Sequence, residues 1–179
     1  MDLNQRVKTF SRGQTAQLAL SLALGPRPEV LILDEPATGL DVMVRRDFLE
    51  SIIHVIQDEG RTIFLSSHLV HEVERIADEV AIIEGGRLIA RGSVDAIKEQ
   101  VKRVLVRSTG GVVDFTGIEG IREIQGDGDG PRMLTVMGFG AEQEAAIKAK
   151  GGEIVEIMDA SLEESFIEHV RPRTGRATS

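Results

Sequence analysis

The sequence predicts an α/β fold followed by a small α+β appendage, and three patterns support this fold class. Two short apolar runs, 30–33 and 62–65, are typical of strands buried on both faces of a parallel sheet. Segments with apolar residues at helical spacing separate and follow these runs, as in helices that connect parallel strands. In residues 103–170 short strand and helix patterns are mixed, which predicts a separate α+β unit.

The composition is that of a globular protein with an acidic balance. The 179 residues suffice for one domain and a small appendage, and 41% of them are hydrophobic. A formal charge of −8 and an isoelectric point near 5.1 argue against nucleic acid as a partner, because phosphate backbones attract clustered Lys and Arg. The sequence has no Cys, no long uncharged apolar run and no signal-peptide pattern, so a cytoplasmic protein is expected.

A helix is expected from about Gly13 to Leu24, and its start can bind an anion. Ser11 and Gln14 have the spacing of a capping box. The first N–H groups of the helix and the positive end of its dipole suit a terminal phosphate, and Gly13 has no Cβ to keep an anion away. A capped helix start is also an ordinary structural feature, so this pattern alone leaves both interpretations open.

The run 30–33 leads into two carboxylates, Asp34 and Glu35, and then Pro36. Pro cannot continue a central strand, so the strand is expected to end at the acidic pair. In open α/β sheets ligands lie beyond the carboxyl ends of the strands. Adjacent strand residues point to opposite sides, so one acid can hold Mg²⁺ while the other addresses a water. Two solvated acids at a strand end are the structural alternative.

Together these patterns resemble the nucleotide-binding domain of ABC transporters. Four motifs occur in the family's order and spacing: the LSGGQ signature at 10–14, the Walker B strand at 31–36, the D-loop at 37–41 and the switch-histidine loop at 66–68. The signature departs from the family pattern at Phe10 and Arg12. The resemblance covers roughly residues 1–100 and implies a partial P-loop NTPase (RecA-like) core.

The resemblance implies that Mg·ATP is bound between two such domains. Asp34 would hold Mg²⁺ through water, Glu35 would act as the catalytic base and His68 would contact the γ-phosphate. Asp41 would couple the two sites across the interface. The signature residues that would contact nucleotide held by the second nucleotide-binding domain are Ser11, Gly13 and Gln14.

The implied function is that of the ATP-hydrolysing subunit of an ABC transporter. It would form a homo- or heterodimer on the inner face of the cell membrane and drive transport, in the export direction, through a separate permease. No G-x-x-x-x-G-K-[ST] P-loop occurs in the sequence, although in the family it precedes the signature. We therefore expect a fragment that is inactive alone. A non-catalytic regulatory subunit and a soluble ABC-type ATPase without a permease remain alternatives.

The elements after the D-loop complete the first predicted domain, 1–102. Asp41 is placed to cap a helix of about 42–58. A short amphipathic helix follows His68, with Glu72 and Glu74 expected on its solvent side. Gly85-Gly86 has the signature of a two-residue hairpin turn. Ser93 is then expected to cap a helix of about 94–102.

The second predicted domain, 103–170, is expected to be ferredoxin-like, similar to C-terminal extensions of some ABC export ATPases. Ser161 and Glu164 form a second capping-box pattern within it. The polar, basic residues 171–179 predict a disordered tail. The elements expected in this domain are strands at 104–106, 121–125, 133–137 and 154–158 and helices near 141–149 and 162–170.

Overall fold

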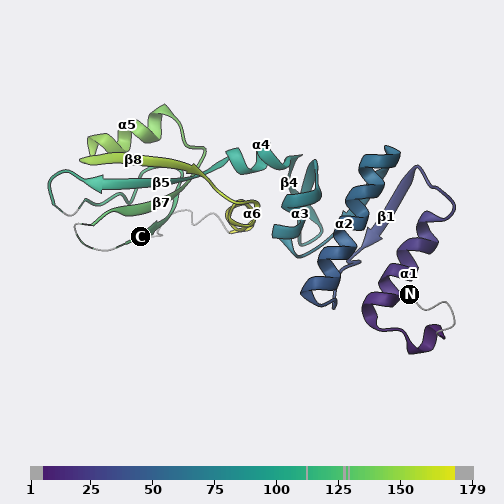
Figure 1. The fold of residues 1–179 in the computed structure, drawn as a ribbon. Coiled ribbons are helices and arrows are strands. Elements are labelled where there is room, and N and C mark those ends of the chain that lie inside the picture. The colour runs from purple at the N-terminus through teal and green to yellow at the C-terminus, as the bar shows by residue number, and fades with distance from the viewer. Residues whose placement is uncertain (1–5, 112, 127, 129, 172–179) are drawn as a thin grey trace. The chain divides into compact units, whose positions relative to one another are not determined.

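The computed structural model describes residues 6–171 except 112, 127 and 129. Within this range, residues 56–59 are described by their backbone only. The described chain falls into two compact units, divided between Ile76 and Ala77. Figure 1 labels their helices and strands. This division by compactness does not test the domain boundary predicted at residue 102, which stays a prediction. Most of the predicted tail, 172–179, lies outside the described residues.

Unit 1 contains a pair of parallel strands and the helices that connect and follow them. The strands β1 and β2 are in register, so that Asp34 lies opposite Ser66 at their carboxyl ends. The predicted order of helices and strands is confirmed. Its elements are the 3₁₀ helix η1 Val7–Thr9, α1 Arg12–Leu24, β1 Val30–Asp34, α2 Val42–Glu59, β2 Thr62–Ser66 and α3 Val70–Ile76.

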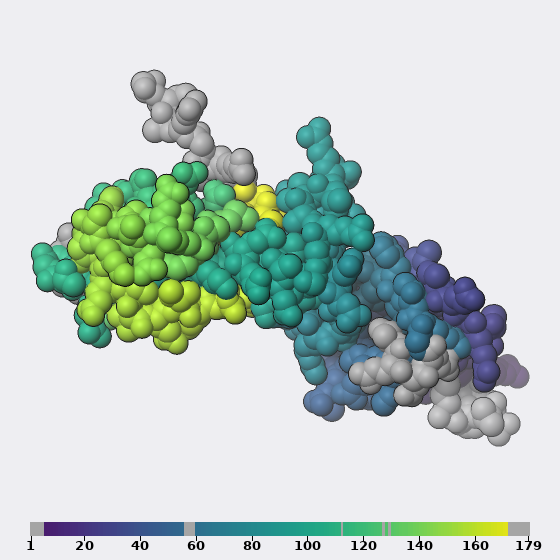
Figure 2. Space-filling model, turned by 90° about the horizontal axis from the view of Figure 1, so that it is seen from above, coloured from purple at the N-terminus to yellow at the C-terminus, as the bar shows by residue number. Residues whose placement is uncertain are grey.

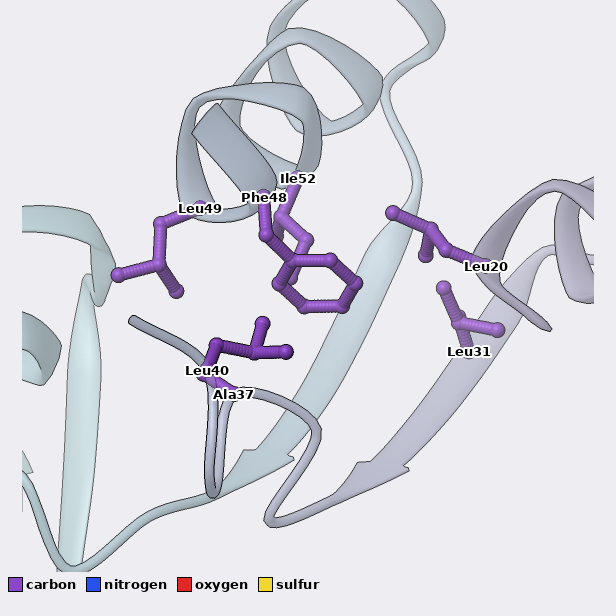
Figure 3. Close-up of a cluster of buried hydrophobic side chains, with 7 residues drawn as sticks. All are labelled: Leu20, Leu31, Ala37, Leu40, Phe48, Leu49 and Ile52. Atoms are coloured by element: carbon purple, nitrogen blue, oxygen red, sulfur yellow. The ribbon is translucent and has the colours of Figure 1, made fainter. Parts of the chain in front are cut away.

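The core of unit 1 lies between the helices, β1 and the loop after β1 (Figure 3). Phe48 of α2 is only 2% exposed, and Leu49 and Ile52 of the same helix also line this core. Ala37 and Leu40 anchor the loop, so the segment after the acidic pair is held by burial at two points. The buried side chains are Leu20, Leu31, Ala37, Leu40, Phe48, Leu49 and Ile52.

The prediction that both apolar runs are buried on both faces is wrong. Val30, Ile32 and Phe64, which share one face of the β1–β2 pair, are 56%, 72% and 64% exposed. Leu31, on the other face, is buried in the core. Within the described residues β1 and β2 form a two-stranded sheet with helices packed on one side only.

The prediction for the solvent side of α3 is wrong at Glu72. This side chain is buried, and its Oε1 lies 3.3 Å from Nη1 of Arg45 in α2. A second nitrogen of Arg45, Nη2, donates to the carbonyl oxygen of Leu40 at 2.8 Å. Because the arginine pairs with the carboxylate, Glu72 can face inward, and the ion pair joins the loop after β1 to α3.

Unit 2 begins with the hairpin β3 Glu79–Glu84 and β4 Arg87–Ser93. Gly85 and Gly86 both have positive φ, 55° and 76°, which confirms the predicted two-residue turn. Ser93 caps α4 as predicted, accepting from the N–H of Ala96 at 3.1 Å. The helix predicted at 94–102 is too long, however. It spans Val94–Glu99, because Val101 already pairs with Met137 in the next sheet.

That sheet has the order β6-β7-β5-β8, and all neighbouring strands are antiparallel. Helix α5 connects β7 to β8. The helix packs against β8, and the green and yellow-green residues of this pair adjoin in Figure 2. The capping box of Ser161 and Glu164 at α6 is confirmed. The elements are β5 Val101–Ser108, β6 Ile121–Gln125, β7 Arg132–Met137, α5 Ala141–Ala149, β8 Gly152–Asp159 and α6 Leu162–Val170.

The core of this sheet is more completely buried than that of unit 1. Its members are 0–8% exposed and include residues of the segment between β5 and β6. Among the described residues that segment contains no helix, and the ferredoxin-like arrangement stays a proposal. The core side chains are Val104, Val106, Phe115, Ile118, Leu134, Val136 and Ile147. Among the helices of the described residues, none combines the length and the hydropathy of a membrane-spanning segment.

Candidate functional site

The carboxyl ends of β1 and β2 form the edge at which three of the predicted site residues, Asp34, Glu35 and His68, meet. Asp34 and Ser66 end the two strands side by side, and the Ser66 hydroxyl donates to Asp34 Oδ1 at 2.5 Å. Asp34 is exposed. Its carboxylate is therefore fixed by a neighbouring strand and open to solvent.

Glu35 is the first residue after β1, and its backbone is unusual. Its φ is +44°, in the left-handed region that non-glycine residues seldom adopt. The Glu35 N–H donates to Ser66, with 2.9 Å to the hydroxyl and 3.2 Å to the carbonyl oxygen. His68 follows β2, and its Nδ1 lies 2.8 Å from Glu35 Oε2. The structure thus brings together the two residues predicted to be catalytic.

The Glu35 carboxylate is held by Thr38 as well. The Thr38 hydroxyl donates to Glu35 Oε2 at 2.8 Å. This hydrogen bond is the main reason that the pKa of Glu35 lies below its ordinary value. Burial opposes it by raising the pKa, and the contact with His68 lowers the pKa further. Glu35 is therefore a carboxylate at neutral pH.

Thr38 and Ser66 were given no role in the sequence analysis, although both lie within the recognised motifs. Their positions in the sequence could have indicated their roles. Ser66 falls opposite Asp34 once the two apolar runs are aligned as parallel strands. Thr38 is three residues after Glu35, the distance across a β-turn whose second residue, Pro36, favours turn formation.

The start of α1 has the predicted capping box. The Gln14 N–H donates to the Ser11 hydroxyl at 3.2 Å, and the Ser11 N–H donates to Gln14 Oε1 at 2.9 Å. Gly13 is buried, and a Cβ there would lie 2.4 Å from Cγ1 of Val44. The packing of α1 on α2 therefore requires glycine at this position, whatever its role toward nucleotide.

Asp41 caps α2 as predicted, accepting from the N–H of Val44 at 3.0 Å. Arg12 lies across the loop before it, since its Nη1 would be 3.1 Å from a Cβ at Gly39. A cavity of about 320 Å³ lies between α1 and this loop. Its lining residues are Phe10, Arg12, Thr15, Ala16, Ala19, Pro36, Thr38 and Leu40.

The residues at the edge fit a magnesium-bound phosphate better than an all-protein metal site. Asp34 offers exposed carboxylate oxygens, which Mg²⁺ prefers. The described residues contain no group of three or more His, Asp or Glu side chains that could hold a metal together. Mg²⁺ typically takes one or two carboxylates and completes its shell with water and substrate phosphates, so Asp34 alone suits this type of binding.

Comparison with known proteins shows what the chain is similar to. No protein-family model matches it. Its curated homologues are ABC transporter ATP-binding proteins at 29–40% identity, which confirms the predicted resemblance, and the chain is consistent with part of an ABC nucleotide-binding domain.

Three relatives show the extent of the similarity. ABC transporter ATP-binding protein NatA of Bacillus subtilis is 37% identical over 54% of this chain and 39% of its own length. Nod factor export ATP-binding protein I of Rhizobium johnstonii is 39% identical over 60% of this chain and 35% of its own length. The uncharacterized ABC transporter ATP-binding protein all4389 of Nostoc sp. is 29% identical over 93% of this chain and 50% of its own length. The chain thus spans between about a third and a half of the length of these relatives.

A solved structure of an ATP-binding subunit of an ABC transporter is 32% identical over 52% of this chain and 38% of that one. The TM-score is 0.45.

Proposed function

We propose that this chain forms part of an ATP-hydrolysing subunit of an ABC transporter, which couples ATP hydrolysis to export of a substrate through a separate membrane permease. The observation that carries the proposal is the contact of Glu35 with His68 at the strand edge that Asp34 shares. The names of the relatives support the transporter role, and one of them is an export protein.

Bound Mg·ATP would supply the reactive phosphate, and the residues at the edge would bind and orient what surrounds it. Asp34 would hold the Mg²⁺ ion through water. Glu35 is ionised at neutral pH, so its carboxylate accepts a hydrogen bond from a water and orients it. The His68 side chain is 62% exposed, so its ring can contact a phosphate while Nδ1 stays on Glu35.

A second nucleotide-binding domain would complete the site, as a homo- or heterodimer. Ser11, Gly13 and Gln14 at the start of α1 would face nucleotide held by that partner, and Asp41 would couple the two sites. The α1 dipole and the Ser11 hydroxyl at its capped start support phosphate binding there. The subunit would be cytoplasmic and peripheral to the membrane through the permease, with residues 103–170 as a ferredoxin-like accessory domain.

The test is a chimaera in which an amino-terminal ABC segment carrying G-x-x-x-x-G-K-[ST] precedes this chain. We expect Mg²⁺-dependent ATP hydrolysis that falls by about a hundredfold or more with Glu35→Gln or His68→Ala. His54→Ala, an exposed histidine of α2, is the matched control and should leave the rate unchanged. The 179-residue chain alone should show no turnover, since it contains no P-loop motif.

Two outcomes would contradict the proposal. One is a chimaera that binds ATP with Glu35 intact but does not hydrolyse it, which would favour a non-catalytic regulatory role. The other is hydrolysis that survives Glu35→Gln at the original rate, since the carboxylate at the strand edge would then do no chemistry.

A further inference from the structure

Thr38 lies in the loop after β1, and its position is determined by a turn that starts at Glu35. The Thr38 N–H donates to the Glu35 carbonyl oxygen at 3.1 Å, which closes a β-turn through Pro36 and Ala37. Ala37 is buried in the core of unit 1 and anchors the turn. The Thr38 side chain is therefore fixed above the residue that begins the turn.

The hydroxyl of Thr38 and the ring of His68 bind the same oxygen of Glu35. Both contacts are 2.8 Å long and both end on Oε2. Among the described residues none makes a recorded hydrogen bond to the other oxygen, Oε1, and 39% of the Glu35 side chain is exposed. The two carboxylate oxygens of Glu35 therefore differ. Oε2 accepts both hydrogen bonds, and Oε1 is left open to solvent.

We propose that Thr38 is a positioning residue, which clamps Glu35 Oε2 against His68 and thereby leaves Oε1 to receive the attacking water. The geometry explains why a side chain is needed here. The Glu35 side chain is 39% exposed, so burial does not hold its carboxylate in one orientation. A second donor on Oε2 restricts the carboxylate to the orientation in which it also reaches His68.

The inference rests on the proposed function only where it concerns the attacking water. The clamp itself belongs to this chain and can be tested without nucleotide. Thr38→Val replaces the hydroxyl by a methyl group of similar size, and Thr38→Ser keeps the hydroxyl. Because Thr38 is exposed, neither substitution disturbs the core.

The first experiment is nitrogen-15 NMR of the His68 ring in the 179-residue chain. We expect Thr38→Val to change the Nδ1 chemical shift and speed the exchange of its proton, because the carboxylate partner becomes mobile. Thr38→Ser should restore both signals. An unchanged His68 spectrum in Thr38→Val, or an equal change in both variants, would overturn the proposal.

The second experiment uses the P-loop chimaera. Thr38→Val should lower kcat about tenfold with an unchanged KM for ATP, and Thr38→Ser should recover most of the rate. A KM effect with constant kcat would contradict a role in orienting Glu35. A chimaera without activity would count against the proposed function, while the NMR result would still decide the clamp.

Discussion

The two compact units cover their sheets differently. In unit 2 the central strands place Val104 and Leu134 at 0% exposure within a closed core. In unit 1 Leu31 of β1 is buried, whereas its neighbour Ile32 is 72% exposed. The four-stranded sheet of unit 2 therefore has a closed core, whereas the sheet of unit 1 has one packed face. Unit 2 also exposes apolar side chains, but on the hairpin β3–β4 and the edge strand β8, such as Ile83 at 64% and Val155 at 46%.

All the candidate site residues lie in the less covered unit. The side chains of Glu35 and His68 are 39% and 62% exposed, so burial does not fix them. The Glu35 carboxylate is held by hydrogen bonds to Thr38 and His68, and the Glu35 backbone N–H is held by Ser66. The comparison teaches that a site can be ordered by turns and hydrogen bonds at the edge of an incompletely covered sheet.

The largest effect is expected from removing a core side chain of unit 2. Phe115→Ala should lower the free energy of unfolding by about 3–5 kcal/mol, because the ring is 1% exposed and its loss leaves a cavity. Denaturant unfolding measures the loss, and hydrogen exchange should place it in unit 2. Val155→Ala, 46% exposed on β8, is the control and should cost less than about 1 kcal/mol. Equal losses of unfolding free energy in the two variants would contradict the assignment of Phe115 to a closed core and of Val155 to the surface.

A smaller effect on stability is expected on the open face of unit 1. Ile32→Thr should change the free energy of unfolding by no more than about 0.5 kcal/mol, because the side chain is already solvated. It should also reduce self-association measured by light scattering, since exposed apolar strand faces promote it. Leu31→Thr, one residue away on the packed face, should cost about 2–5 kcal/mol. Similar costs for both would show that the two faces are equally covered.

The smallest effect is a pH dependence from Glu35. Its pKa is lower in the folded chain than its ordinary value of 4.5, so the folded state favours the carboxylate. The resulting stabilisation is present above pH 4.5 and is lost as the pH falls through the lower folded-state pKa. Acid titration of stability should therefore be flatter in Glu35→Gln. A steeper acid loss in the variant would contradict the assigned hydrogen bonds.

Much of the site could be predicted because its residues follow strand ends. Asp34 follows one apolar run and His68 follows the other, and parallel strands bring their carboxyl ends together, so a common edge is predictable from the two runs. The pairing of Glu35 with His68 through one oxygen could not be predicted, because it depends on a backbone φ of +44° and a side-chain rotamer. The burial of Glu72 also escaped prediction, since its partner Arg45 lies on another helix.

The local pattern of this sequence determined the order of helices and strands, the capping boxes at Ser11 and Ser161 and the Gly85-Gly86 turn. These features depend on neighbours along the chain, and residue type and spacing specify them. Only the tertiary structure decided which face of β1 is covered, why Gly13 must be glycine and which oxygen of Glu35 is held. Those depend on contacts between segments distant in sequence, whose distances local patterns do not contain.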